Sequence, residues 1–257
     1  MGLIKSLRRR QTRKRQQRER IALFNDAIRS LGMPLKVHHG PFKGMLYPPS
    51  KSAWGELYPR YLGSYERELH QVIEGIMSED YSEIVDIGCA EGYYAVGLAM
   101  NLPQADIYAY DANEEAASMT RTMAEVNSIE PERFHIGGYC STETLISLPY
   151  RRRALIICDC EGCEKSLFQP DTPAKLAMHD LLIETHDVID IEISAYLESI
   201  FEETHNIDRI LSVDDIQKAK YYNYPELESY DLDKRRILLS EQRGGIMEWL
   251  YLRAKER

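Results

Sequence analysis

Residues 83–94 have the sequence EIVDIGCAEGYY, and this stretch decides the fold. Its apolar start at residues 83–87 indicates a short buried strand, and Gly88 and Gly92 let the chain turn tightly before a helix begins at Tyr93. Four more apolar runs follow, at residues 107–110, 134–136, 154–158 and 181–185, with helical patterns between them. Strands that are apolar on both faces and alternate with helices predict a parallel sheet covered on both sides. We therefore predict an α/β protein with a doubly wound sheet.

The rest of the chain is expected to supply helices, loops and two further strands. Hydrophobic periodicity predicts helices at residues 11–31, 64–77, 93–100, 114–127, 142–147 and 193–203, with shorter pieces between 164 and 178. It predicts strands at residues 207–212 and 247–253. Residues 38–63 are rich in Gly and Pro, which indicates an ordered loop region, and the polar stretch 213–246 is an excursion with its own helix. We divide the chain into a basic helical arm (1–34), a loop and helix leading into the core (35–80) and a ligand-binding domain (81–257).

Charge is distributed unevenly along the chain. Residues 1–20 contain nine Lys or Arg and one Glu, a formal charge of +8, which leaves −17 for the remainder because the whole chain has −9. We expect this arm either to contact an anionic surface or partner, or to be a solvated helix. No apolar run reaches the ~18 residues of a membrane span, and residues 1–20 lack the apolar centre of a secretory signal. We therefore expect a cytoplasmic protein without a transmembrane segment.

The five cysteines do not suggest a disulfide framework in a chain of this length, so we expect reduced thiols. Cys158, Cys160 and Cys163 have a C-x-C-x-x-C spacing that is compatible with zinc. No fourth ligand at the usual spacing is nearby, so we favour small buried apolar side chains over a zinc site.

A nucleoside site is expected at the ends of the first two strands. In an open parallel sheet, ligands bind beyond the carboxyl ends of the strands. Gly88 and Gly92 allow close approach of the backbone to a ligand, and Asp111 closes the second strand where a carboxylate can accept hydrogen bonds from ribose hydroxyls. The G-x-G-x-x-G spacing that suits a diphosphate is absent. A ribose without a diphosphate points to S-adenosylmethionine, whereas the alternative is a plain tight turn followed by a helix cap.

Several motifs resemble a known enzyme family. Residues 86–94, DIGCAEGYY, resemble the first motif of class I methyltransferases, in which an acid precedes a glycine-rich turn. Residues 159–164, DCEGCE, resemble the D-x-E-G-x-E signature of the FkbM-type methyltransferases within that class. Residues 62–66, LGSYE, and residues 183–186, IETH, extend the resemblance, together with the closing strand that holds Trp249.

This resemblance implies a Rossmann-like sheet, mostly parallel with an antiparallel last strand, and methyl transfer from S-adenosylmethionine to a hydroxyl oxygen of a sugar or other small metabolite. Gly88 and Gly92 would lie against the methionine and ribose, Asp111 would hold the ribose, and Tyr65 or Glu66 would close over the donor. The sequence departs from the commoner D-x-G-A-N form at residues 89–91. The implied donor-binding residues are Tyr65, Glu66, Asp86, Gly88, Cys89, Ala90, Glu91, Gly92, Asp111 and Ala112.

Acidic residues are expected to gather at the acceptor side. Asp159 ends the fourth strand, Glu161 follows it and Glu184 ends the fifth, so these carboxylates should converge near His186 as catalytic residues. One of them acts as general base, or Asp159 and Glu184 hold a divalent cation, for which Mg²⁺ suits oxygen ligands. The structural alternatives are a helix-stabilising acid at Glu164 and a plain turn at Glu161.

Two rival functions remain at this point. One is a methyltransferase that acts on protein or nucleic acid, with the basic arm gripping a polyanion, although an N-P-P-Y type tetrapeptide does not follow the fourth strand. The other is a non-catalytic protein that keeps the donor pocket for binding.

Overall fold

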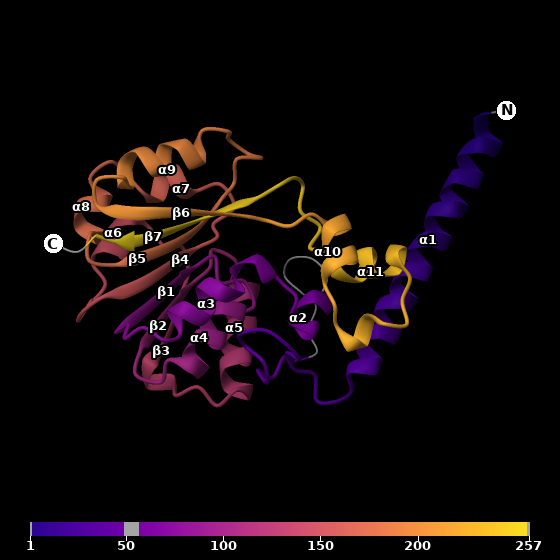
Figure 1. Cartoon of the computed structure of the whole chain (residues 1–257), viewed down its shortest axis with the longest axis horizontal. Coiled ribbons are helices and arrows are strands. Elements are labelled where there is room, and N and C mark those ends of the chain that lie inside the picture. Colours follow the sequence, from indigo (N-terminus) through magenta and orange to yellow (C-terminus); the bar gives the residue numbers. More distant parts are fainter. Residues whose placement is uncertain (1, 49–56, 256–257) are drawn as a thin grey trace.

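The computed structural model describes residues 2–48 and 57–255, and a seven-stranded sheet forms its centre (Figure 1). The spatial order is β3-β2-β1-β4-β5-β7-β6. Strands β1 to β5 pair in parallel, and β7 lies antiparallel between β5 and β6. This confirms the doubly wound, Rossmann-like sheet with an antiparallel last strand. The strands are β1 Glu83–Ile87, β2 Asp106–Tyr110, β3 Phe134–Gly137, β4 Ala154–Cys158, β5 Asp180–Thr185, β6 His205–Leu211 and β7 Glu248–Ala254.

Predicted strand bounds hold best where a strand is buried on both faces. Strands β1 and β4 begin and end at the predicted residues, and every one of their side chains is buried. Strand β6, at the edge of the sheet, begins at His205 rather than residue 207, and its burial alternates irregularly. An edge strand has fewer apolar positions, so its sequence marks its ends less clearly.

Helices connect the strands largely as predicted. The predicted helix at residues 64–77 begins later, as a 3-10 turn at Arg67–Leu69 that leads into α3, because Glu66 has a left-handed backbone with φ 45°. The helices are α1 Gly2–Leu31, α2 Tyr58–Leu62, α3 His70–Ile76, α4 Tyr93–Asn101, α5 Glu114–Val126, α6 Thr142–Ile146, α7 Glu164–Leu167, α8 Thr172–Leu176, α9 Ile193–Phe201, α10 Asp215–Tyr221 and α11 Leu232–Leu239.

Two apolar layers cover the sheet, one on each face. Alternate residues of β1 supply both: Ile84 packs with residues from α3, α4 and α5, whereas Val85 and Ile87 pack with residues from α6, α7, α8 and α9. Burial on both faces explains why the strands are continuous apolar runs rather than alternating patterns.

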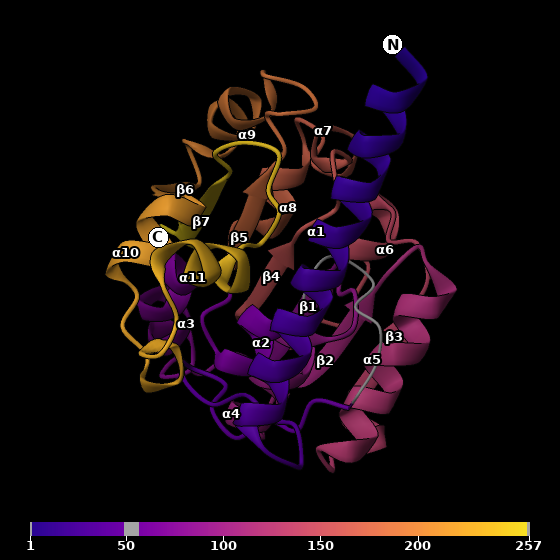
Figure 2. The same ribbon diagram turned by 90° about the vertical axis from the view of Figure 1, so that its right-hand side faces the viewer.

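Helices α1, α2, α10 and α11 lie together on the side toward which the parallel strands point (Figures 1 and 2). The carboxyl-terminal half of α1 belongs to the core, since Phe24, Ala27 and Leu31 are buried there. The other half, which carries the basic residues, extends away from the body (Figure 1). Its anionic partner stays a prediction. Among the described residues, none of the helices has the length and apolar character that crossing a bilayer requires.

Candidate functional site

A cavity of about 620 Å³ opens at the carboxyl ends of β1, β2, β4 and β5. The turn after β1 and the end of β2 form one end of it, and the ends of β4 and β5 form the other. The loop at residues 240–247, between α11 and β7, closes one wall. The cavity brings together every predicted site residue except Gly92, namely Tyr65, Glu66, Asp86, Gly88, Cys89, Ala90, Glu91, Asp111, Ala112, Asp159, Glu161, Glu184 and His186.

Backbone amides fix the carboxylate of Asp111 at the end of β2. Its Oδ2 accepts a hydrogen bond from the backbone N–H of Ala90 at 2.9 Å, and its Oδ1 accepts one from the N–H of Asn113 at 2.8 Å. Each carboxylate oxygen can accept a second hydrogen bond. Asp111 therefore retains lone pairs for the two hydroxyls of a ribose, in a position set by the glycine turn.

The structure also explains why the two positions of that turn, 88 and 92, are glycines. Gly88 has φ 84°, and a Cβ there would overlap the carbonyl oxygen of Asp159, which directly follows the neighbouring strand β4. Gly92 has φ 92° and packs against Thr120 of α5, outside the cavity lining. Gly88 thus brings the two ends of the cavity together, while the contact predicted for Gly92 with the donor stays a prediction.

Four non-glycine residues of the cavity wall have left-handed backbone conformations. They are Glu66, Ala90, Glu161 and Gln242, with φ of 45°, 47°, 53° and 57°. Such conformations are unfavourable for residues with a Cβ, and they persist where the surrounding structure imposes them, often at functional sites.

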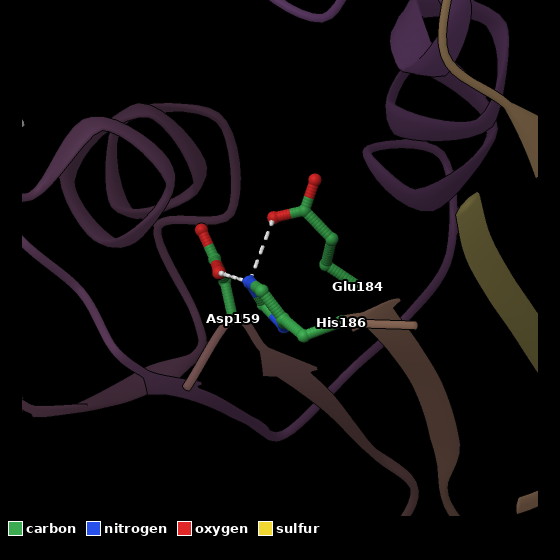
Figure 3. Close-up of side chains that lie close together, drawn as sticks. All are labelled: Asp159, Glu184 and His186. Atoms are coloured by element: carbon green, nitrogen blue, oxygen red, sulfur yellow. Dashed lines mark ion pairs between the residues drawn. The ribbon is translucent and has the colours of Figure 1, made fainter. Parts of the chain in front are cut away.

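His186 lies at the centre of the acidic end and is buried (Figure 3). Its Nδ1 is 2.5 Å from Oε1 of the buried Glu164, so the imidazole N–H donates to that carboxylate. Its Nε2 faces the cavity, 3.4 Å from Asp159 Oδ1, 3.5 Å from Glu161 Oε2 and 3.8 Å from Glu184 Oε2. The predicted convergence of the three carboxylates and His186 is therefore present. Glu164, considered above only as a helix-stabilising acid, is the residue that orients the imidazole.

The surroundings raise the pKa of His186 and the pKa of Asp159. Burial opposes a charge on His186, but the hydrogen bond that the imidazole donates to Glu164 and the charges of the nearby carboxylates outweigh it and raise the pKa of His186 above 6.5. Burial and the charge of Glu184 raise the pKa of Asp159 well above its usual range. The acidic end thus holds protons more tightly than free side chains do.

Arg243, on the loop at residues 240–247, balances the remaining acids. Its guanidinium forms ion pairs with Glu184, with Glu66 at 2.6 Å and with Glu241 at 3.1 Å. Glu241 is also paired with the buried Lys218 of α10 at 2.6 Å. Nothing in the sequence marks Arg243, because its partners lie on three separate parts of the chain.

The cluster suits the predicted Mg²⁺ poorly. Asp159, Glu184 and His186 can each bring one ligand atom within 4.8 Å of the others. However, the guanidinium of Arg243 already neutralises Glu184 and would repel a dication, and the imidazole is a nitrogen ligand, whereas Mg²⁺ favours oxygen. We therefore derive no step through a metal ion.

The cysteines differ from expectation in one respect. Cys160 and Cys163 form a disulfide across the turn at Glu161-Gly162, whereas Cys89, Cys140 and Cys158 are free and buried. The expectation of five reduced thiols was wrong because two left-handed residues fold this turn back and bring the two Cα atoms to 5.5 Å. Cys158 packs in the apolar layer below. The three residues therefore do not form a zinc site.

No family model matches the chain, and no curated protein matches it. Solved structures similar to it include a putative O-methyltransferase from Klebsiella pneumoniae, with 12% identity over 90% of each chain and a TM-score of 0.45. Coclaurine N-methyltransferase bound to N-methylheliamine and SAH has 13% identity over 98% of this chain and 94% of its own, with a TM-score of 0.44. Precorrin-6y C5,15-methyltransferase from Geobacter metallireducens has 12% identity over 71% of this chain and 87% of its own, with a TM-score of 0.44. The strand order described above, not these likenesses, carries the fold assignment.

Proposed function

We propose that this protein is an S-adenosylmethionine-dependent methyltransferase of the FkbM type that methylates a hydroxyl oxygen of a sugar or other small metabolite. One observation carries the proposal: a buried Glu164–His186 pair faces the same cavity in which Asp111 is held ready for a ribose. A positioned base at one end and a nucleoside-binding carboxylate at the other are what transfer from an adenosyl donor to a hydroxyl requires.

The donor site fits a nucleoside that lacks a diphosphate. S-adenosylmethionine, when bound, supplies an electrophilic methyl group on sulfur. Asp111 would hold its ribose, and Gly88, which lacks a side chain, lets the turn approach the backbone of Asp159 closely, so that the ribose site lies near the acidic end. Tyr65 and Glu66 line the cavity above the turn and would shield the donor from water.

His186 is the general base of the proposed reaction. The acceptor hydroxyl lies against Nε2, its proton passes to that nitrogen as the oxygen–methyl bond forms and the sulfur–methyl bond breaks, and S-adenosylhomocysteine leaves with the sulfur electron pair. Glu164 holds the imidazole in place through Nδ1 and stabilises the imidazolium. Asp159 and Glu161 accept hydrogen bonds from further hydroxyls of the acceptor, and Arg243 forms an ion pair with Glu184.

A screen of small hydroxylated acceptors with labelled donor tests this function. We expect labelled product from at least one polyol or sugar, unchanged by chelator. The variant Asp159→Asn should lose most of the turnover while keeping its affinity for S-adenosylhomocysteine. Donor binding without transfer to any acceptor would favour a non-catalytic protein, and absence of donor binding would refute the proposal.

A nucleic-acid acceptor is the second candidate, because the basic half of α1 projects from the side toward which the parallel strands point (Figures 1 and 2), and the cavity lies at the carboxyl ends of those strands. The acids around His186 oppose a phosphate backbone there. Including transfer RNA and single-stranded DNA in the same screen distinguishes the two acceptors.

A further inference from the structure

The disulfide between Cys160 and Cys163 closes the turn that carries the acids around His186. Cys160 directly follows Asp159 in the sequence, and Cys163 directly precedes Glu164. The imidazole lies between these two acids, since its Nε2 is 3.4 Å from Asp159 Oδ1 and its Nδ1 is 2.5 Å from Glu164 Oε1. The crosslink therefore joins the two chain positions that flank His186.

The backbone inside the crosslink is held in an unfavourable conformation. Glu161 has φ 53° and Gly162 has φ 97°, and a left-handed backbone is unfavourable for a residue with a Cβ such as Glu161. Two hydrogen bonds also hold this turn: the N–H of Cys163 donates to the carbonyl of Cys160 at 3.4 Å, and the N–H of Gly162 donates to Glu164 Oε1 at 3.2 Å. Both are longer than the usual value of about 2.9 Å. The covalent crosslink is therefore a main restraint on the shape of the turn.

A thiol in solution can reach this disulfide. Cys160 and Cys163 are partly exposed and line the cavity, whereas Cys89, Cys140 and Cys158 are free and at most 4% exposed. Accessible disulfides exchange with thiols, and cysteines with the C-x-x-C spacing are often reactive, whereas buried cysteines are inert. Exchange should therefore be confined to the pair at the acidic end.

We propose that Cys160 and Cys163 form a thiol–disulfide exchange site, at which a dithiol reductant opens the turn and displaces its acids from His186. A thiolate of the reductant attacks one of the two sulfurs, the disulfide bond breaks, and the released sulfur takes a proton. The second thiol of the reductant then attacks the mixed disulfide. The reductant leaves as a disulfide, and the protein has gained two electrons and two protons. A disulfide oxidant reverses the exchange.

The oxidised form is the one that positions the base. Once the crosslink is broken, Glu161 can leave its left-handed conformation and carry its carboxylate away from Nε2 of His186, from which it is 3.5 Å distant. The same movement loosens Glu164 at Nδ1. The inference goes beyond the proposed function, because it concerns the geometry of the acidic end whichever acceptor binds there.

Dithiothreitol, applied to the folded wild-type protein, is the first test. A thiol reagent should find no reactive thiol in the oxidised native protein and two after reduction, and three and then five when the protein is denatured, because three of the five cysteines are free. Proton NMR follows the titration of His186, whose resonance the His186→Ala spectrum identifies. Reduction should lower the pKa of His186 toward 6.5, because the carboxylates that raise it move away.

Turnover is the second readout. In a protein that transfers methyl groups, reduction should lower kcat about 10-fold, because the base is no longer held in place, and oxidised dithiothreitol should restore it. A double variant with Cys160→Ser and Cys163→Ser should resemble the reduced form and ignore both reagents. Cys140→Ala removes a free buried cysteine, keeps the crosslink and should respond like the wild type. If the double variant does not fold, the two redox forms of the wild type decide the question.

The outcomes separate this site from the proposed function. Two reactive thiols that persist after treatment with oxidised dithiothreitol would refute the exchange site. An unchanged titration of His186 on reduction, or an unchanged kcat in an active protein, would do the same, and the proposed function would stand. If neither redox form transfers a methyl group, the proposed function fails, while the titration of His186 still decides the exchange site.

Discussion

The two ends of the cavity hold their carboxylates by different means. At the end of β2, backbone amides of Ala90 and Asn113 fix Asp111, so its position depends on the course of the chain. At the ends of β4 and β5, side chains balance the acids: His186 lies among Asp159, Glu161, Glu164 and Glu184, and Arg243 pairs with Glu184, Glu66 and Glu241. The end at Asp111 is suited to one invariant ligand. At the end around His186, substitution of side chains can change which ligand fits. Under the proposed function, this difference fits a donor site set by the backbone and an acceptor site set by side chains.

Removal of the proposed general base, His186, should have the largest effect, and this effect should be confined to the acidic end of the cavity. In His186→Ala we expect kcat to fall about 10²- to 10⁴-fold, because the acceptor hydroxyl no longer has a group to take its proton. Affinity for S-adenosylhomocysteine should stay within threefold of the wild-type value, which calorimetry measures. A variant that turns over normally would remove His186 from the mechanism.

Replacement of Arg243, the positively charged residue at the acidic end, should destabilise the fold. Arg243→Met leaves Glu66, Glu184 and Glu241 without their shared partner, and breaking a buried pair costs about 3 kcal/mol of unfolding free energy. Chemical denaturation at several pH values checks this.

The pH dependence of that loss has a definite sign. Burial raises the pKa of Glu66 to about 7 from an ordinary 4.5. A raised folded-state pKa means that protonation favours the folded protein, so stability falls as pH rises from 4.5 through 7. The loss in Arg243→Met should therefore be largest above pH 7 and shrink toward pH 5. An equal loss at every pH would contradict the assignment.

At the other end of the cavity, Asp111→Asn should weaken donor binding about 10-fold while leaving the turnover at saturating donor within threefold. The amide keeps one acceptor oxygen but loses the charge-assisted hydrogen bonds to the ribose. Initial rates over a range of donor concentrations separate these two effects. A large loss of kcat with unchanged donor affinity would reverse the roles of the two ends.

The smallest effect is expected from Glu164→Gln. The base must be neutral, so kcat/KM should rise with pH to a midpoint above 6.5 in the wild-type protein, because the pKa of His186 is raised. Glu164→Gln removes the carboxylate that raises this pKa, which should lower the midpoint and reduce kcat about 10-fold. Glu143→Gln, an exposed acid of α6, serves as the control and should leave the profile unchanged. An unaltered midpoint in Glu164→Gln would mean that Glu164 only supports the helix.

The same difference between the two ends explains what the sequence predicts. The bounds of β1 and β4 were predicted correctly because both strands are uniformly buried, and Asp111 followed from the end of β2 because local backbone geometry sets it. The position of Arg243 did not follow, since 177 residues separate it from Glu66 and 59 from Glu184. Arg60, which also lines the cavity, lies within the region 38–63, which is rich in Gly and Pro and shows no periodicity. The disulfide depends on the left-handed backbone of Glu161 and Gly162. A glutamate gives no indication in the sequence that its backbone will be left-handed.

The central claim is that an adenosyl donor spans the cavity from Asp111 to the acidic end, and a crystal structure with S-adenosylhomocysteine tests it most directly. The account predicts ribose hydroxyls within hydrogen-bonding distance of the Asp111 carboxylate and the sulfur directed toward Asp159 and His186. Binding at another place, or with the ribose away from Asp111, would contradict it.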